Sequence, residues 1–159
     1  KAKGAVVIAS DMVPKRLQMA ENFGIDYVFD GSKTNVAAEV MKITHGEGVN
    51  VLIDAAGAPG IMDNAVDLIS PMGRIVPVAF NFHPSPVVYA KINLKEARIS
   101  GSRLESGKFP VVIEALPRHQ AHIKAQITHS FPVEQINEAF ELAAGRNPDV
   151  GKVIVKYCD

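Results

Sequence analysis

The chain has 159 residues, 47% of them hydrophobic, which is enough to bury one sizeable core. Its 17 Lys and Arg residues balance 17 Asp and Glu residues without forming a basic block, so nucleic acid is not expected as a partner. No apolar run approaches the ~20 residues of a membrane-spanning helix, and no membrane partner is expected either. The one cysteine, Cys158, excludes an internal disulfide framework and favours a cytoplasmic location.

The first part of the chain predicts alternating strands and helices. Residues 1–4 have the composition of a helix end with its glycine stop, so we expect the chain to be a fragment of a longer protein. The elements predicted next are a strand over 5–10, a helix over 14–23, a strand over 27–29 and a helix over 34–44.

Residues 50–80 have the pattern of a complete strand, helix and strand unit. An apolar run over 51–53 is typical of a parallel strand covered on both faces, and Ile61, Ala65, Leu68 and Ile69 are spaced to share one face of a helix. Ser70 and Pro71 end that helix, and a second apolar strand follows over 75–80. Such a unit is expected to be a right-handed parallel crossover, with its ligand side at the carboxyl ends of the two strands.

The spacing of the predicted strands indicates the fold class. Strands starting at 5, 27, 51, 74 and 98 lie 22 to 24 residues apart, which is the interval of an α/β protein with a doubly wound parallel sheet. Pro84 and Pro86 predict an irregular loop over 80–94, leading to a strand over 97–102. Beyond residue 106 the strands are shorter and half polar, so we place a domain boundary there and expect the α+β remainder to form a different sheet.

Asp11 is the sharpest single signal for a ligand. A carboxylate at the end of a parallel strand is placed to accept hydrogen bonds from both ribose hydroxyls of an adenine dinucleotide, and it would repel a 2′-phosphate. The alternative is an Asp that caps the helix near Pro14. The sequence lacks the G-x-G-x-x-G turn that would separate the two interpretations, so the fold is expected to lack its first strand and glycine-rich turn.

Two further groups of residues are candidates for a site. Small residues near the ends of the central strands allow a flat ring to approach the backbone, although ordinary tight turns have the same composition. The two stretches are Ala55, Ala56 and Gly57, and Val78, Ala79 and Phe80, in which Phe80 is the one large side chain. His119 and His122 have a spacing compatible with a shared metal, but no further ligand lies at the right distance in sequence, and a polar turn is the alternative. We predict neither a metal site nor a catalytic nucleophile in this chain.

Six segments, in the same order, resemble the zinc-containing medium-chain alcohol dehydrogenases along the whole chain. They are 6–11, 16–17, 48–54, 71–76, 100–104 and 127–132. The stretch Ser102-Arg103-Leu104, followed by Lys108-Phe109-Pro110, is most similar to the branch that includes the sorbitol, threonine and gulonate dehydrogenases.

The resemblance implies a domain arrangement and two cofactors. Residues 1–106 would be part of an NAD-binding Rossmann domain, and residues 107–159 the C-terminal part of the catalytic, GroES-like domain. Asp11 would bind the adenosine ribose with Arg16 beside it, and the small residues at the strand ends would line the nicotinamide side. Arg103 would face the active-site cleft. Zinc would be held by residues outside this chain, and the family commonly has glycine where Ala79 stands.

The function implied is hydride transfer between NAD and a secondary alcohol of a polyol or sugar acid. Two alternatives remain open: a zinc-independent quinone or enone reductase of the same superfamily, and a non-catalytic dinucleotide-sensing or oligomerisation module. The intact protein is expected to be a homodimer or homotetramer, joined through the strand over 97–102. The isolated chain is expected to be inactive.

Overall fold

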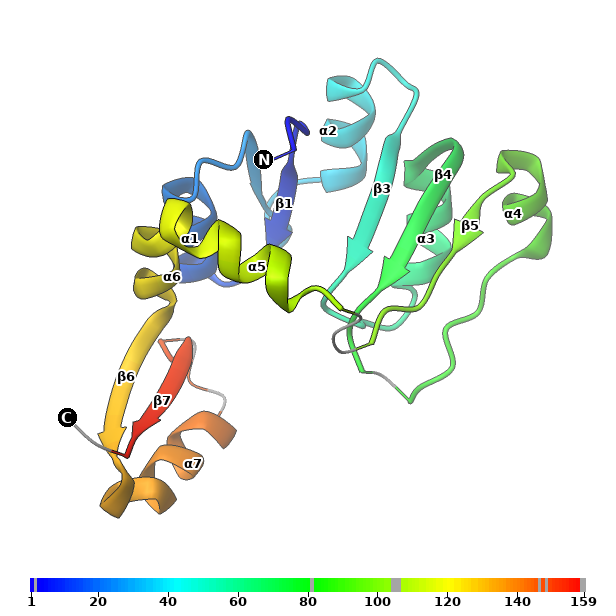
Figure 1. The fold of residues 1–159 in the computed structure, drawn as a ribbon. Helices are drawn as coiled ribbons and strands as arrows, with labels where there is room; N and C mark the ends of the chain where they lie inside the picture. The colour runs from blue at the N-terminus through cyan, green and yellow to red at the C-terminus, as the bar shows by residue number, and fades with distance from the viewer. Residues whose placement is uncertain (2, 81, 104–106, 146, 148, 158–159) are drawn as a thin grey trace. The chain divides into compact units, whose positions relative to one another are not determined.

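The computed structural model describes residues 1–157 except 2, 81, 104–106, 146 and 148 (Figure 1). Helices and strands alternate along most of the chain, as the spacing of apolar segments predicted. The elements are β1 (Ile8–Asp11), α1 (Pro14–Asn22), β2 (Tyr27–Asp30), α2 (Val36–Ile43), β3 (Val49–Asp54), α3 (Ile61–Leu68), β4 (Ile69–Pro77), α4 (Tyr89–Lys95), β5 (Arg98–Ile99), α5 (Phe109–Ala115), η1 (Leu116–His119), α6 (Gln120–Gln126), β6 (Ile127–Pro132), η2 (Val133–Gln135), α7 (Ile136–Ala144) and β7 (Lys152–Lys156).

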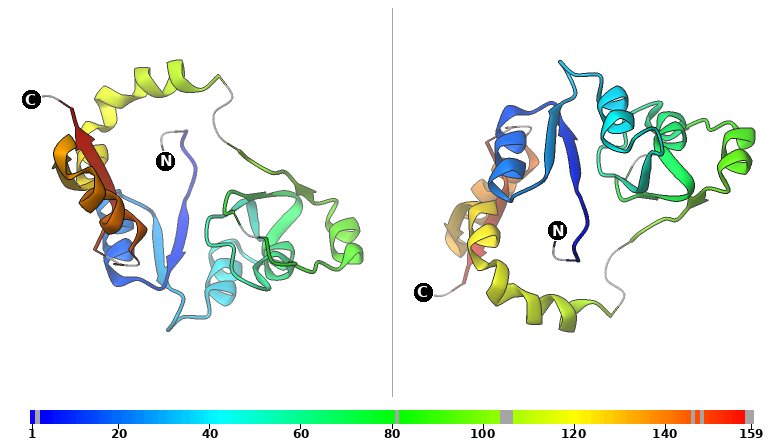
Figure 2. Two further views of the ribbon diagram at one scale, coloured as in Figure 1. Left: turned by 90° about the horizontal axis from the view of Figure 1, so that it is seen from below. Right: turned by 90° about the horizontal axis from the view of Figure 1, so that it is seen from above.

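Every strand pair found among these elements is parallel. The sheets have the orders β1-β2, β3-β4-β5 and β6-β7. The chain forms two compact units: the first combines Lys1–Ser32 with Glu105–Asp159, and the second is Lys33–Leu104. In the first unit, α7 lies along the β6-β7 pair (Figure 2). The α/β class with parallel strands is therefore confirmed.

The second unit is built around the strand, helix and strand unit that the sequence predicted. Ala65 and Val66 of α3 are buried against Ile69 and Ile75 of β4, and Leu52 of β3 packs on the same cluster. Ala65 lies on the apolar face that the helical period predicted, whereas Val66 lies outside that face and Ile69 begins β4 instead of ending the helix. α3 therefore covers one face of the three-stranded sheet and fixes the directions in which β3 and β4 end.

The predicted interruption before the second strand lies inside β4. The register advances from Val49 opposite Ile69 to Val51 opposite Arg74, so residues 70–73 stand outside the regular ladder. Met72 has a positive φ of 60° there, which is the backbone of a turn. The strand then ends at Pro77, three residues before the limit expected at Phe80.

The segment between β4 and β5 differs from the prediction. A helix, α4, forms where an irregular loop was expected, because Pro84 and Pro86 precede its first residue, Tyr89, and exclude only an earlier start. Strand β5 comprises only Arg98 and Ile99 of the six residues expected.

The C-terminal helical region also differs from the prediction. α5 ends before Pro117, as expected, but the chain continues as the 3-10 helix η1 and then as α6. The predicted boundary at residue 106 lies outside the described residues, as does Cys158. No helix in the described part is long and apolar enough to cross a membrane.

Candidate cofactor site

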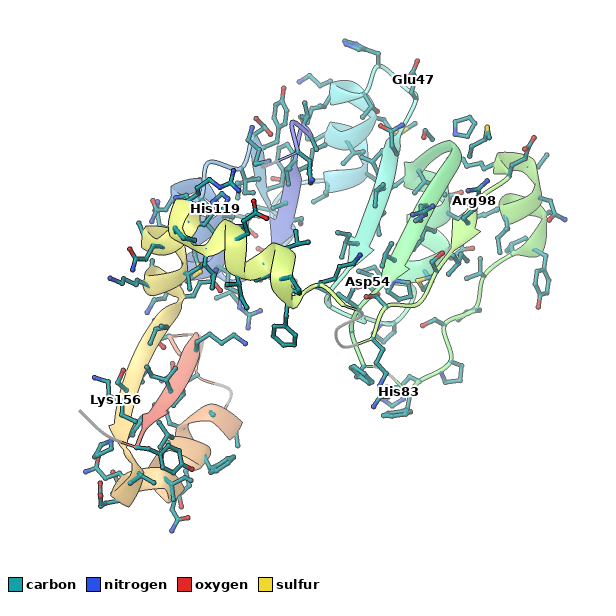
Figure 3. The ribbon with its side chains drawn as sticks, in the orientation of Figure 1. Glu47, Asp54, His83, Arg98, His119 and Lys156 are labelled. Atoms are coloured by element: carbon teal, nitrogen blue, oxygen red, sulfur yellow. The ribbon has the colours of Figure 1, made fainter. Side chains whose placement is uncertain are left out.

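The carboxyl end of β3 carries a buried carboxylate that organises the turn after it. Asp54 is 4% exposed and lies at the end of the strand (Figure 3). Its Oδ1 accepts hydrogen bonds from Ala56 N at 3.0 Å and from Gly57 N at 2.9 Å. Gly57 has a φ of 61°, a conformation that glycine adopts without steric cost. The turn is therefore fixed by one side chain and one permissive backbone position.

The backbone of the same residue holds the end of β4. Asp54 O accepts hydrogen bonds from Val78 N at 2.8 Å and from Ala79 N at 3.2 Å. Asp54 pairs with Pro77 at the last position of the ladder, beyond which β4 ends. The two groups of small residues predicted as a nicotinamide surface are thus brought together, and Asp54 joins them.

These hydrogen bonds restrict what the strand ends offer a ligand. The amides of Ala56, Gly57, Val78 and Ala79 all donate to Asp54, so none of the four is left to bind a phosphate. Ala55 and Ala56 are exposed and small. The surface suits a flat ring without negative charge that lies against methyl groups and backbone, whereas it is poorly suited to an anion.

Arg103 stands over the ring of Phe80, which belongs to the same predicted surface. The guanidinium carbon lies 5.3 Å from the ring centroid, within the distance of a cation–π contact. Phe80 is 68% exposed, so this contact lies at the surface of the second unit. The guanidinium keeps its hydrogen-bond donors while one face rests on the ring, because stacking does not use the N–H groups in its plane.

Asp11 and Arg16 form the candidate ribose site in the first unit. Asp11 Oδ1 accepts hydrogen bonds from Met12 N at 2.7 Å and Val13 N at 2.9 Å, and Oδ2 lies 3.5 Å from Arg16 Nη1. The side chain thus closes a turn just before α1, and α1 itself has Val13 as its N-cap residue with no side-chain cap hydrogen bond, so Asp11 does not cap the helix as the alternative interpretation of the sequence proposed. Among the described residues Oδ2 has no backbone donor, so this turn and ribose binding are compatible.

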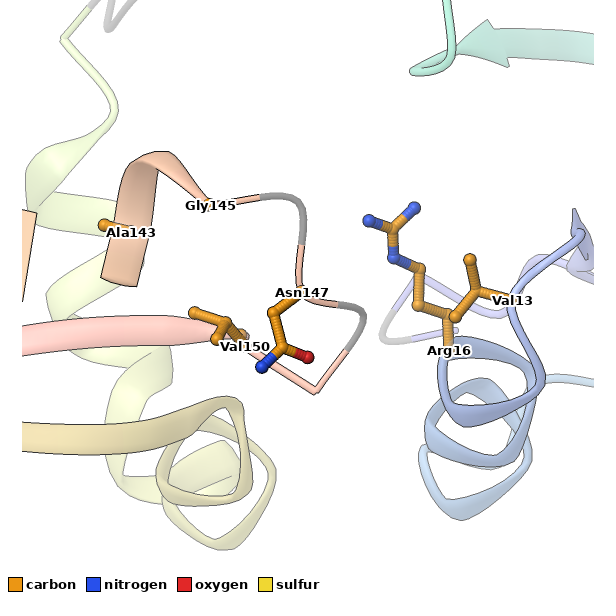
Figure 4. A pocket seen from close by; sticks show the side chains of 7 residues that line it. Val13, Arg16, Ala143, Gly145, Asn147 and Val150 are labelled. Atoms are coloured by element: carbon orange, nitrogen blue, oxygen red, sulfur yellow. The ribbon is translucent and has the colours of Figure 1, made fainter. Parts of the chain in front are cut away.

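Arg16 also lines a cavity of about 480 Å³ within the first unit (Figure 4). Val13 and Arg16 border it at the start of α1, while Ala143, Gly145, Asn147 and Val150 border it at the end of α7 and beyond. Nearby, Lys15 Nζ lies 2.8 Å from Asp149 Oδ1. This cavity was not predicted, because its walls come from segments more than a hundred residues apart in the sequence.

The described residues contain no group that fits a zinc ion. No three His, Cys, Asp or Glu side chains of this part of the chain are arranged to hold a metal. The rings of His119 and His122 have centroids 6.4 Å apart, and His122 lies 5.1 Å from the ring of Phe23. This pair is an aromatic contact at the surface of α6 and η1.

The role of Asp54 was missing from the sequence prediction, which placed Asp54 only as the end of a strand. The sequence signal was present, since Asp followed by two small residues and Gly is typical of a side chain that binds the backbone two residues on. The burial of Asp54 and its second set of hydrogen bonds depend on the pairing of β3 with β4, which sequence spacing does not define.

Comparison with known proteins identifies a matching family and several relatives of similar sequence. A family described as zinc-binding dehydrogenase matches residues 1–118. The chain is 33% identical over 155 residues to the starvation-sensing protein RspB of Escherichia coli K12, covering 96% of this chain and 44% of that protein. It is 28% identical over 157 residues to (R,R)-butanediol dehydrogenase of Neisseria gonorrhoeae, covering 98% and 44%.

Solved structures agree with these matches. The crystal structure of a dehydrogenase, rspB, from Escherichia coli CFT073 in complex with NADH has a TM-score of 0.84 and 34% identity, covering 95% of this chain and 44% of that one. The structure of 2R,3R-butanediol dehydrogenase from Bacillus subtilis has a TM-score of 0.88 and 25% identity, covering 99% and 45%. The chain thus spans somewhat less than half the length of these relatives. With its parallel strands and a match over residues 1–118, the chain belongs to the zinc-binding dehydrogenase family.

Proposed function

We propose that the protein containing this chain is a zinc-dependent oxidoreductase that transfers a hydride between NAD and a secondary alcohol of a polyol or sugar acid. The observation that carries the proposal is the pair of strand ends joined by Asp54, in a chain of the zinc-binding dehydrogenase family. Relatives named as butanediol dehydrogenase and L-threonine 3-dehydrogenase support a small hydroxylated substrate.

The residues of this chain supply binding and orientation. NAD, when bound, supplies the hydride acceptor. Asp11 Oδ2 would accept hydrogen bonds from the adenosine ribose, because Oδ1 is already engaged by two backbone amides. The turn at Ala55–Gly57 and the chain at Val78–Phe80 would hold the nicotinamide, with the amides of Ala56, Gly57, Val78 and Ala79 donating to Asp54.

The cofactor preference expected is NAD over NADP. A carboxylate at the ribose would repel a 2′-phosphate, and Arg16, which could neutralise that phosphate, already lies 3.5 Å from Asp11. Arg103, with one face on Phe80, would present its donors to cofactor or substrate. Zinc would be bound by residues outside this chain.

The experiment is a substrate screen with the full-length protein. Purified enzyme with zinc is tested with NAD and NADP against polyols and aldonates, and the absorbance of the reduced cofactor is followed. Turnover is expected with at least one of them, faster with NAD, and lost after zinc is removed by a chelator. Absence of turnover with every polyol and aldonate would reject the proposal. Reduction of quinones or enones without zinc would instead identify a reductase of the same superfamily.

We also propose that the protein self-associates through β5. This strand pairs with β4 on one side, and it is the last strand of its sheet in the described residues. Ile99 is 41% exposed there, and an exposed apolar side chain on a strand at a sheet edge favours pairing with another copy. Light scattering of the full-length protein at micromolar concentration tests this, and a monomer would contradict it.

A further inference from the structure

We infer that Asp54 is a positioning residue that fixes the nicotinamide half of the cofactor by holding two separate walls of its site. This inference rests on the function proposed above. It concerns a residue that touches no cofactor atom itself: its side chain is buried beneath the turn that it holds. Its effect on binding and rate would be transmitted through the backbone of the two turns.

A buried carboxylate at Asp54 is costly unless hydrogen bonds hold it. A carboxylate that is 4% exposed loses most of its hydration, and this loss is offset only when its oxygens accept hydrogen bonds. Asp54 Oδ1 accepts two, from Ala56 N and Gly57 N. Hydrogen bonds to a charged acceptor are stronger than neutral ones, so the turn is held more firmly than a turn closed by backbone alone.

The main chain of Asp54 holds the end of β4 as well. The carbonyl of Asp54 receives both Val78 N and Ala79 N, at 2.8 and 3.2 Å. The side chain and the main chain of one residue therefore hold two segments that are more than twenty residues apart. A displacement of Asp54 would move both segments, and a small displacement of a catalytic surface has a large effect on rate.

The effect of Asp54 should be specific for the nicotinamide half of the cofactor. Asp54 holds only segments in the second unit, Lys33–Leu104, whereas the candidate ribose residues Asp11 and Arg16 belong to the first. A change at Asp54 should therefore weaken binding of the nicotinamide ring without weakening binding of the adenosine ribose. ADP-ribose, which lacks the nicotinamide, separates the two contributions.

The test compares three variants of the full-length protein. Asp54→Ala removes both side-chain hydrogen bonds, and Asp54→Asn keeps an Oδ1 that accepts them. Asn35→Ala is the matched control, because Asn35 Oδ1 also accepts a backbone hydrogen bond, from Ala38 N at 3.1 Å, at the start of α2 in the same unit. NADH affinity is measured by fluorescence, ADP-ribose affinity by displacement, and kcat and KM with the substrate identified in the screen.

Asp54→Ala is expected to weaken NADH binding about tenfold or more, since two charge-assisted hydrogen bonds are lost. ADP-ribose affinity should be unchanged, and kcat should fall together with NADH affinity. Asp54→Asn should restore most of the NADH affinity, and Asn35→Ala should lower the midpoint of thermal unfolding with no effect on either ligand.

Two results would overturn the inference. One is unchanged NADH affinity and kcat in Asp54→Ala, and the other is an equal loss of NADH and ADP-ribose, which indicates a general structural role. If Asp54→Ala does not fold, Asp54→Glu replaces it: this variant keeps the charge but moves the carboxylate by one methylene. Unaltered NADH binding in Asp54→Glu would then overturn the inference, and selective loss would support it. If the unmutated protein binds neither probe, the proposed function itself fails.

Discussion

The loss of stability caused by a side chain at Gly48, just before β3, can be estimated from the structure. Gly48 precedes the strand with a φ of 85° and lies against the junction of α3 and β4. A Cβ added there would lie 2.5 Å from Leu68 O, and 2.8 and 2.9 Å from the carbonyl carbon and oxygen of Ile69. All three neighbours are backbone atoms in the best-packed part of the second unit, so no side-chain rotation relieves the overlap. Gly48→Ala is therefore expected to be strongly destabilising.

Two other glycines separate the causes of this loss. Gly46 has nearly the same φ, 87°, but open space around it, so Gly46→Ala tests backbone strain alone, about 1 to 2 kcal/mol. Gly73 has no positive φ, but its Cβ would lie 2.7 Å from Ser70 O, so Gly73→Ala tests close packing alone, about 1 to 3 kcal/mol. Gly48→Ala combines both effects, and the sum of the two ranges is about 2 to 5 kcal/mol.

The assay is urea unfolding of the three variants and the unmutated full-length protein, followed by circular dichroism. Gly48→Ala is expected to lose more free energy of unfolding than either Gly46→Ala or Gly73→Ala. A loss in Gly48→Ala no larger than that in Gly46→Ala would refute the reasoning, because the close approach to the α3–β4 junction would then have no energetic effect.

The remaining predictions concern the cofactor, pH and the isolated chain. Asp11→Ala should weaken NAD binding by about 1 to 3 kcal/mol in calorimetry of the full-length protein. Asp11→Asn, which keeps an acceptor for the amides of Met12 and Val13, should mainly narrow the preference for NAD over NADP; equal binding of both cofactors by the unmutated protein would contradict the assignment. Lys91→Met should lower the midpoint of thermal unfolding, because Lys91 Nζ lies 2.8 Å from carboxylate oxygens of both Asp63 and Asp67. The hydrogen bond from Lys91 lowers the pKa of Asp63 below 3.8, and the hydrogen bonds to Asp63 and Asp67 raise the pKa of Lys91 above 10.5. The difference in the midpoint of thermal unfolding between Lys91→Met and the unmutated protein should therefore be constant at pH values between these two pKa values. It should shrink as the pH falls through the lowered pKa or rises through the raised one, and a difference that is largest at either extreme would contradict the assignment. Residues 1–159 alone should bind NAD weakly or not at all, and micromolar binding in calorimetry would show this to be wrong.

Local sequence patterns predicted much of the fold. Helix α3 and the strands around it follow from apolar periodicity, and the parallel pairing follows from the regular spacing of strands. The pairs β1-β2 and β3-β4-β5 are also those that the order 3-2-1-4-5-6 requires when its strand 1 is left out. Helix α4 was missed because two prolines were taken to exclude helix over a longer stretch than their local effect covers.

The candidate site was predictable only in part. Small residues at strand ends indicated a surface for a flat ring, and their proximity follows from parallel pairing. The hydrogen bonds that Asp54 makes to both segments depend on where β4 ends, and β4 ends at Pro77 and not at Phe80 as the apolar run suggested. The contact between Arg103 and Phe80 joins residues on either side of α4, which no local pattern relates.

Strand β3 has apolar side chains on both of its faces, although only one face is packed against the core cluster. Val51 and Ile53 are 54% and 64% exposed, whereas Leu52 between them packs on the core cluster. A strand covered on one face only normally alternates apolar and polar residues, because polar side chains on the open face remain hydrated. Among the described residues β3 pairs with β4 alone, and an apolar strand with a free edge favours unwanted pairing. Both faces of β3 thus have the composition of a strand that is covered on both sides, which is what the doubly wound order predicts for it.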